Sequence, residues 1–163
     1  MIRTLAALLT TVLFAGVACA QGPGESVPSV TMAPVGKVQL KAGGTANVEL
    51  DFRVGSAFHI NSNKPKSELL IPTVLKLSPP QQVSIAAIKY PAGQDMSFPF
   101  APTEKLNVYS GDFSITAVVK APAKSTSGVF PVTGELHFQA CDRSACYPPR
   151  SIPIKFEVAV ESR

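Results

Sequence analysis

Two cysteines of this sequence lie in one stretch between two predicted strands: Phe138-Gln139-Ala140-Cys141-Asp142-Arg143-Ser144-Ala145-Cys146-Tyr147-Pro148-Pro149. Residues 135–138 before it and 152–160 after it alternate apolar and polar side chains, which is typical of strands. The cysteines therefore lie on the connection between two strands or just inside their ends, where a thiol pair is accessible. Pro148 and Pro149 stiffen one side of this connection.

Four residues separate Cys141 from Cys146, so an oxidised pair closes a small ring. Such a pair is either a local structural disulfide in a secreted β protein or a redox-active pair that exchanges electrons with partners. In the chain-entropy model, closing a loop of about six residues stabilises a fold by roughly 2 kcal/mol, against about 4.7 kcal/mol for a 100-residue loop. The predicted disulfide adds little stability, but the spacing alone leaves both interpretations open.

The N-terminal residues predict export. A basic residue, Arg3, precedes an apolar run, and Ala18-Cys19-Ala20 fits the small-x-small rule for signal-peptide cleavage. We therefore predict a signal peptide over residues 1–20 and a periplasmic mature chain. The alternative is a lipoprotein lipidated on Cys19, which Gly16 disfavours because a large aliphatic residue is expected there.

Export leaves two cysteines in an oxidising compartment, which is an even number. A zinc site needs four ligands, and besides the cysteines only His59 and His137 could contribute, so we expect no metal and no cofactor. The charged residues are scattered, which gives no basic patch for nucleic acid.

The rest of the chain predicts one all-β domain over residues 37–163, after a flexible leader over residues 21–36 that is rich in Gly, Pro and Ser. Short alternating segments separated by turn residues favour an antiparallel β-sandwich, with a small barrel as second choice. The predicted strands are 37–42, 46–54, 57–61, 72–77, 82–90, 106–109, 113–120, 134–139 and 152–160.

Residues 91–104 are predicted to form a long loop. The segment contains three prolines, and Met96, Phe98 and Phe100 are among its few large apolar residues. Loops of this length in a compact domain are usually functional or disordered. Exposed phenylalanine side chains are costly, so the two aromatic rings either cover a site or fill the edge of the core.

Two motifs resemble those of a known family: Phe138-Gln139-Ala140-Cys141 and Cys146-Tyr147-Pro148-Pro149. The family is the N-terminal periplasmic domain of the thiol:disulfide interchange protein DsbD, together with its stand-alone exported relatives. Phe58-His59-Ile60-Asn61-Ser62 and the segments 70–73 and 105–111 add to a resemblance that spans roughly residues 35–160.

The resemblance implies an immunoglobulin-like sandwich whose cysteines cycle between dithiol and disulfide. It implies that electrons arrive from a membrane-embedded donor and leave to periplasmic thioredoxin-like proteins. It also implies a cap loop with an aromatic residue, here Phe98 or Phe100, that shields the cysteine pair. We expect the domain to be monomeric. Three residues, His59, Asn61 and Tyr147, are placed beside the cysteines, and Cys146 is implied to form the mixed disulfide that Cys141 resolves.

The sequence departs from the family in three respects. The spacer between the cysteines is one residue shorter than in the best-known relatives, and the cap segment is longer and richer in proline. The sequence shows no membrane segments or thioredoxin domain after the β domain, so we expect the electron donor to be a separate protein. One alternative function is a non-catalytic immunoglobulin-like binding module with a structural hairpin disulfide. A second alternative is a copper-binding protein that uses the cysteines, Met96 and histidine as ligands.

Overall fold

The computed structural model describes residues 28–162, which form twelve strands and no helix. Among these residues, accordingly, no helix could span a membrane. The predicted signal peptide lies outside the described residues. The strands are β1 Val30–Met32, β2 Val38–Lys41, β3 Thr45–Val54, β4 His59–Asn61, β5 Val74–Ser78, β6 Ser84–Lys89, β7 Gln94–Phe98, β8 Ala101–Tyr109, β9 Asp112–Lys120, β10 Gly128–Phe138, β11 Ala140–Cys141 and β12 Arg150–Glu161.

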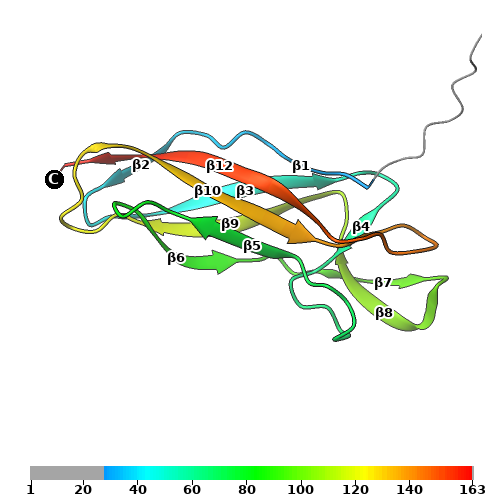
Figure 1. The fold of residues 1–163 in the computed structure, drawn as a ribbon. Helices are drawn as coiled ribbons and strands as arrows, with labels where there is room; N and C mark the ends of the chain where they lie inside the picture. The colour runs from blue at the N-terminus through cyan, green and yellow to red at the C-terminus, as the bar shows by residue number, and fades with distance from the viewer. Residues whose placement is uncertain (1–27, 163) are drawn as a thin grey trace, which may run out of the picture.

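Two four-stranded sheets form an elongated sandwich, and a third sheet lies at one end of it (Figure 1). The sandwich sheets have the orders β1-β3-β9-β6 and β2-β12-β10-β5, and the end sheet has the order β11-β4-β8-β7. All pairs are antiparallel except β12 with β2. The chain is therefore an all-β protein with an immunoglobulin-like fold, as the sequence predicted.

The core follows from the alternation within the long strands. In β12 the side chains of Ile154, Phe156, Val158 and Val160 are buried, while the residues between them are mostly exposed. Strand β9 repeats the pattern facing the other sheet. Each fully buried side chain of this size contributes roughly 1.5–3 kcal/mol of transfer free energy, so the stability of the domain comes mainly from these two sheets.

The prediction of a flexible leader is wrong for residues 30–32. These residues form β1, which pairs with β3 from Val30 opposite Val54 to Met32 opposite Phe52, and Val30 is buried. The ordered domain thus begins before residue 37. A strand of three residues between prolines is too short to show a period in the sequence, which explains the error.

The prediction of a long loop over residues 91–104 is also wrong. Most of this segment forms β7 and the start of β8, a hairpin that projects from the end of the sandwich (Figure 1). We call this the cap hairpin, residues 94–109. Its outer half is exposed on both faces, so its side chains do not alternate between apolar and polar and the strand signal is absent.

Candidate functional site

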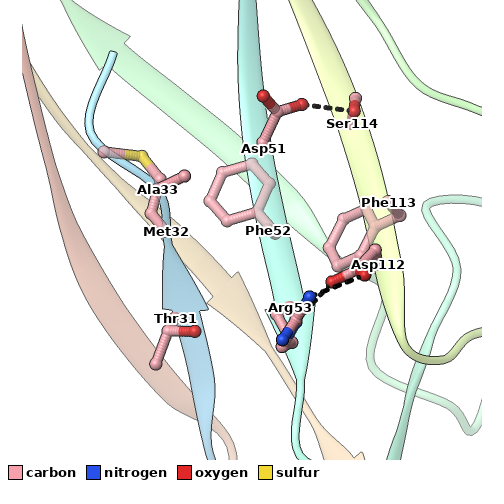
Figure 2. A pocket seen from close by; sticks show the side chains of 9 residues that line it. All are labelled: Thr31, Met32, Ala33, Asp51, Phe52, Arg53, Asp112, Phe113 and Ser114. Atoms are coloured by element: carbon pink, nitrogen blue, oxygen red, sulfur yellow. Dashed lines mark hydrogen bonds and ion pairs between the residues drawn. The ribbon is translucent and has the colours of Figure 1, made fainter.

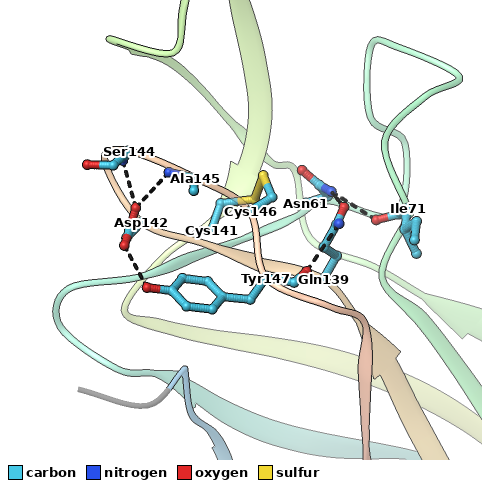
Figure 3. Close-up of a disulfide and its surroundings, with 9 residues drawn as sticks. All are labelled: Asn61, Ile71, Gln139, Cys141, Asp142, Ser144, Ala145, Cys146 and Tyr147. Atoms are coloured by element: carbon cyan, nitrogen blue, oxygen red, sulfur yellow. Dashed lines mark hydrogen bonds between the residues drawn. A yellow bond between two sulfur atoms is a disulfide. The ribbon is translucent and has the colours of Figure 1, made fainter. Parts of the chain in front are cut away.

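Cys141 and Cys146 form a disulfide at the end of the sandwich, with an S–S distance of 2.06 Å (Figure 3). Cys141 ends β11 and is fully buried, whereas Cys146 lies after the turn and is exposed. The two residues of one covalent pair therefore differ in access: a partner can approach Cys146, and Cys141 is enclosed by the fold.

The ring is held by a tight turn built around Asp142. The Asp142 amide donates to the Ala145 carbonyl at 2.9 Å, and the Asp142 carboxylate accepts from the amides of Ser144 at 2.6 Å and Ala145 at 2.8 Å. An aspartate that bonds to amides further along its own chain is a common way to close a turn. These bonds hold the pKa of Asp142 below its usual value.

Tyr147 fixes the far side of the ring. Its amide donates to the Ala140 carbonyl at 2.8 Å, and its hydroxyl donates to the Asp142 carboxylate at 2.8 Å. Its ring meets Phe58 edge-on at 5.7 Å between centroids. The resemblance placed Tyr147 beside the cysteines, but the turn at Asp142 was not predicted. The Asp-x-Ser-Ala spacing was the signal for the turn.

Strand β4 runs beside the buried cysteine. His59 pairs directly opposite Cys141 in the β4–β11 ladder, so their side chains lie on the same face, and Asn61 lies on that face two residues further along β4. His59 is 4% exposed and Asn61 is 0% exposed. The register thus brings together His59, Asn61 and Cys141, three residues that the sequence analysis had grouped.

The amide of Asn61 joins three segments. Its nitrogen donates to the Ile71 carbonyl at 3.0 Å and to the Gln139 side-chain oxygen at 3.3 Å, and Gln139 in turn donates to the Tyr147 carbonyl at 3.2 Å (Figure 3). This network connects β4 to both sides of the disulfide ring. The role of Gln139 was not predicted from the sequence, because it depends on the register of β4 with β11.

Two buried atoms on this face have no hydrogen-bond partner among residues 28–162: His59 Nε2 and Asn61 Oδ1. Burial lowers the pKa of His59 to about 4, against a smaller opposite effect of the Asp142 carboxylate. The imidazole is therefore neutral at neutral pH, and it lies in a site from which water is largely excluded.

The cap hairpin covers His59. The Phe98 ring stacks on the imidazole at 3.9 Å between centroids with an interplanar angle of 15°, and Phe100 stacks on the outer side of Phe98 at 5.5 Å. Phe98 is 6% exposed and Phe100 is 37% exposed. Phe98 also belongs to a small apolar cluster with Leu106 and Val108. The ring thus fills a small core and covers the direct neighbour of Cys141.

Polar contacts tie the cap hairpin to the loop over residues 62–73. Asp95 accepts from Lys66 and, at 2.8 Å, from the Asn107 side chain; these bonds lower the pKa of Asp95. Where the chain enters β7, a Cβ on Gly93 would lie 2.0 Å from Asn107 Oδ1, so this close approach requires glycine. Exposed ion pairs contribute little to stability, so the cap is held mainly by its apolar cluster.

A separate hollow of about 550 Å³ lies along β1, β3 and β9 (Figure 2). An exposed Arg53–Asp112 ion pair and Phe52 line it, and Ser114 donates to Asp51. None of its lining residues belongs to the disulfide site. Nowhere in residues 28–162 are three or more His, Cys, Asp or Glu side chains grouped so that they could hold a metal ion.

Residues 29–157 match the family described as "Thiol:disulfide interchange protein DsbD, N-terminal". No curated protein sequence is similar enough to this chain to count as a match.

Three solved structures illustrate the similarity. The first is the complex of the DsbD N-terminal and PilB N-terminal domains from Neisseria meningitidis, with 19% identity, 83% of this chain and 87% of that chain covered, and a TM-score of 0.44. The seventh ScaB type I cohesin from Pseudobacteroides cellulosolvens has 12% identity, 82% and 93% coverage, and a TM-score of 0.51. The N-terminal periplasmic domain of ScsB from Proteus mirabilis has 12% identity, 80% and 46% coverage, and a TM-score of 0.50. At these identities the cohesin and ScsB structures show a shared fold.

Proposed function

This chain belongs to the family of the DsbD N-terminal domain, and we propose that it is an exported thiol–disulfide interchange domain. It passes reducing equivalents from a membrane-embedded donor to thioredoxin-like proteins in the periplasm through Cys141 and Cys146. One observation of the structure carries the proposal: a disulfide at the end of the sandwich joins an exposed and a buried cysteine.

The exchange begins when the donor's dithiol reduces the Cys141–Cys146 disulfide. The Cys146 thiolate then attacks the disulfide of an oxidised partner, so that a mixed disulfide forms and one partner sulfur leaves as a thiolate. Cys141 loses its proton and attacks Cys146, which restores the internal disulfide and releases the partner as a dithiol. Two electrons pass to the partner, whose sulfurs take up two protons.

The difference in access supports these roles. A mixed disulfide needs room for a second protein at the attacked sulfur, and only the exposed Cys146 offers it. The resolving thiol must lie close to the mixed disulfide and out of reach of the disulfides of other proteins, and the buried Cys141 meets both conditions. In this proposal Phe98 and Phe100 are the cap residues, and they limit access to the buried Cys141 side of the pair until a partner displaces the hairpin.

Trapping of a mixed disulfide tests the proposal. A Cys141→Ser variant lacks the resolving thiol and should accumulate a covalent complex with a thioredoxin-like protein, visible on non-reducing gels of periplasmic extract. The Cys146→Ser variant is the matched control and should trap little. Trapping by Cys146→Ser alone would reverse the roles, and no trapping by either variant would remove the main support for the proposal.

The alternative is a binding module in which the same disulfide is only structural. It would have no partner thiol to exchange with, so neither variant would trap a thioredoxin-like protein. The stabilisation expected from so small a ring, roughly 2 kcal/mol, leaves both interpretations open, and the difference in access between Cys146 and Cys141 favours the redox interpretation.

A further inference from the structure

The two unpartnered atoms of β4 lie on the same face as the buried cysteine. His59 is opposite Cys141 in the ladder, and Asn61 is the diagonal neighbour of Cys141. Figure 3 shows the Asn61 nitrogen turned to Ile71 and Gln139 and the Asn61 oxygen on the side of the disulfide. Asn61 Oδ1 is therefore on the side of the sulfur pair, and the other unpartnered atom, His59 Nε2, belongs to the residue that pairs with Cys141 in the ladder.

Two such atoms on one face of a three-residue strand call for an explanation, because buried polar groups are nearly always hydrogen-bonded. The Asn61 amide is held in one orientation, since its nitrogen spans two acceptors. Its oxygen can only accept, and the neutral imidazole of His59 carries one nitrogen that accepts. In the oxidised form the sulfurs carry no proton and cannot donate to either atom.

Reduction supplies the missing donor. Two electrons and two protons convert the disulfide into two thiols, and the proton on Cys141 is added inside the fold, on the face of β4. We propose that His59 and Asn61 are positioning residues built for the dithiol form, whose Cys141 S–H donates a hydrogen bond to this pair of acceptors. The inference rests on the proposed function, because it concerns the redox step of that site.

The consequence is a raised reduction potential. The disulfide form leaves two acceptors unpaired and the dithiol form satisfies one of them, so the contacts stabilise the reduced form relative to the oxidised form. Phe98 stacks over His59 and excludes water, which strengthens the effect because bulk water cannot take the place of the thiol. The domain thereby accepts electrons from its donor more readily.

Reduction potentials of the full chain in dithiothreitol redox buffers test the inference. His59→Phe keeps an aromatic ring for Phe98 but removes the nitrogen, and Asn61→Leu removes the oxygen. Each should shift the equilibrium about tenfold toward the disulfide, which lowers the potential by about 30 mV for a two-electron couple. The control is His137→Phe on β10, whose imidazole contacts Ser151 and not the site; its potential should equal that of the wild type.

A lowered potential in either variant supports the inference, and unchanged or raised potentials in both overturn it. If both variants fail to fold, the infrared S–H stretching band of the reduced wild type tests the inference instead. A band shifted to lower frequency shows a donating thiol, and two free-thiol bands overturn the inference. The outcome is separate from the trapping experiment: trapping with unchanged potentials would leave the proposed function standing, whereas shifted potentials without trapping would remove the carrier role alone.

Discussion

The two sandwich sheets and the end of the domain that carries the disulfide differ in the side chains that they bury. In the sandwich, apolar side chains such as Leu50 and Val158 alternate with exposed ones and are fully buried. At the disulfide end, buried side chains include His59 and Asn61, and each leaves an atom unpaired. Regions that break the packing rules are where function is expected. The comparison therefore assigns stability to the sandwich and the proposed redox chemistry to its end.

The largest expected effect on stability comes from a core mutation in the sandwich. Leu50→Ala removes a fully buried side chain from β3 and should lower the free energy of unfolding by about 2–5 kcal/mol. Denaturant unfolding of the oxidised and reduced forms measures the loss, which should be equal in both. A loss confined to one redox form would mean that the two regions are energetically coupled.

The next largest effect is the pH dependence of stability that His59 causes. Its pKa is about 4 in the folded protein, against 6.5 for an imidazole that is not buried. The unfolded chain binds more protons between these values, so stability is complete above pH 6.5 and falls as the pH drops towards 4, by about 2–3 kcal/mol. Unfolding free energies at pH 7 and pH 4.5 measure the difference. His59→Phe should lose less stability than the wild type over this range; an equal loss would assign the pH dependence to other groups.

Reduction of the disulfide should cost less than a core mutation. Opening a ring of six residues removes roughly 2 kcal/mol in the chain-entropy model, so the reduced domain should remain folded with a cooperative transition. Thermal unfolding with and without reductant tests this. Loss of the cooperative transition on reduction would make the disulfide a structural element.

The smallest expected effect in free energy comes from a mutation in the cap hairpin. Phe98→Ala should speed alkylation of the reduced cysteines about tenfold, which corresponds to about 1.4 kcal/mol less free energy for opening the cap. Phe100→Ala is the matched control, because its ring stacks on Phe98 from the outside and should change the rate less. An unchanged rate for Phe98→Ala with a large loss of stability would mean that Phe98 only fills the small core.

The sequence predicted the sandwich well because burial on one face imposes a period. The predicted strands 46–54 and 113–120 differ from β3 and β9 by one residue at the start. The predicted strand 106–109 is the inner end of β8. The rest of the cap hairpin and β1 were missed because exposure on both faces, or a length of three residues, leaves no period to detect.

The site was predicted only in part. The resemblance placed His59 and Asn61 beside the cysteines, and the register of β4 with β11 puts them there. The Asp142 turn was missed because its hydrogen bonds depend on the path of the chain. The unpaired atoms were also missed, since which polar atoms stay unpaired depends on the packing of β4, β11 and the cap together.

The reduction potential of the wild-type pair tests the central claim most directly. A domain whose disulfide end is specialised for exchange should have a potential in the range of exchange proteins, about −120 to −270 mV, when equilibrated with redox buffers. A potential below about −300 mV is typical of structural disulfides, and it would contradict the assignment of redox chemistry to this end of the sandwich.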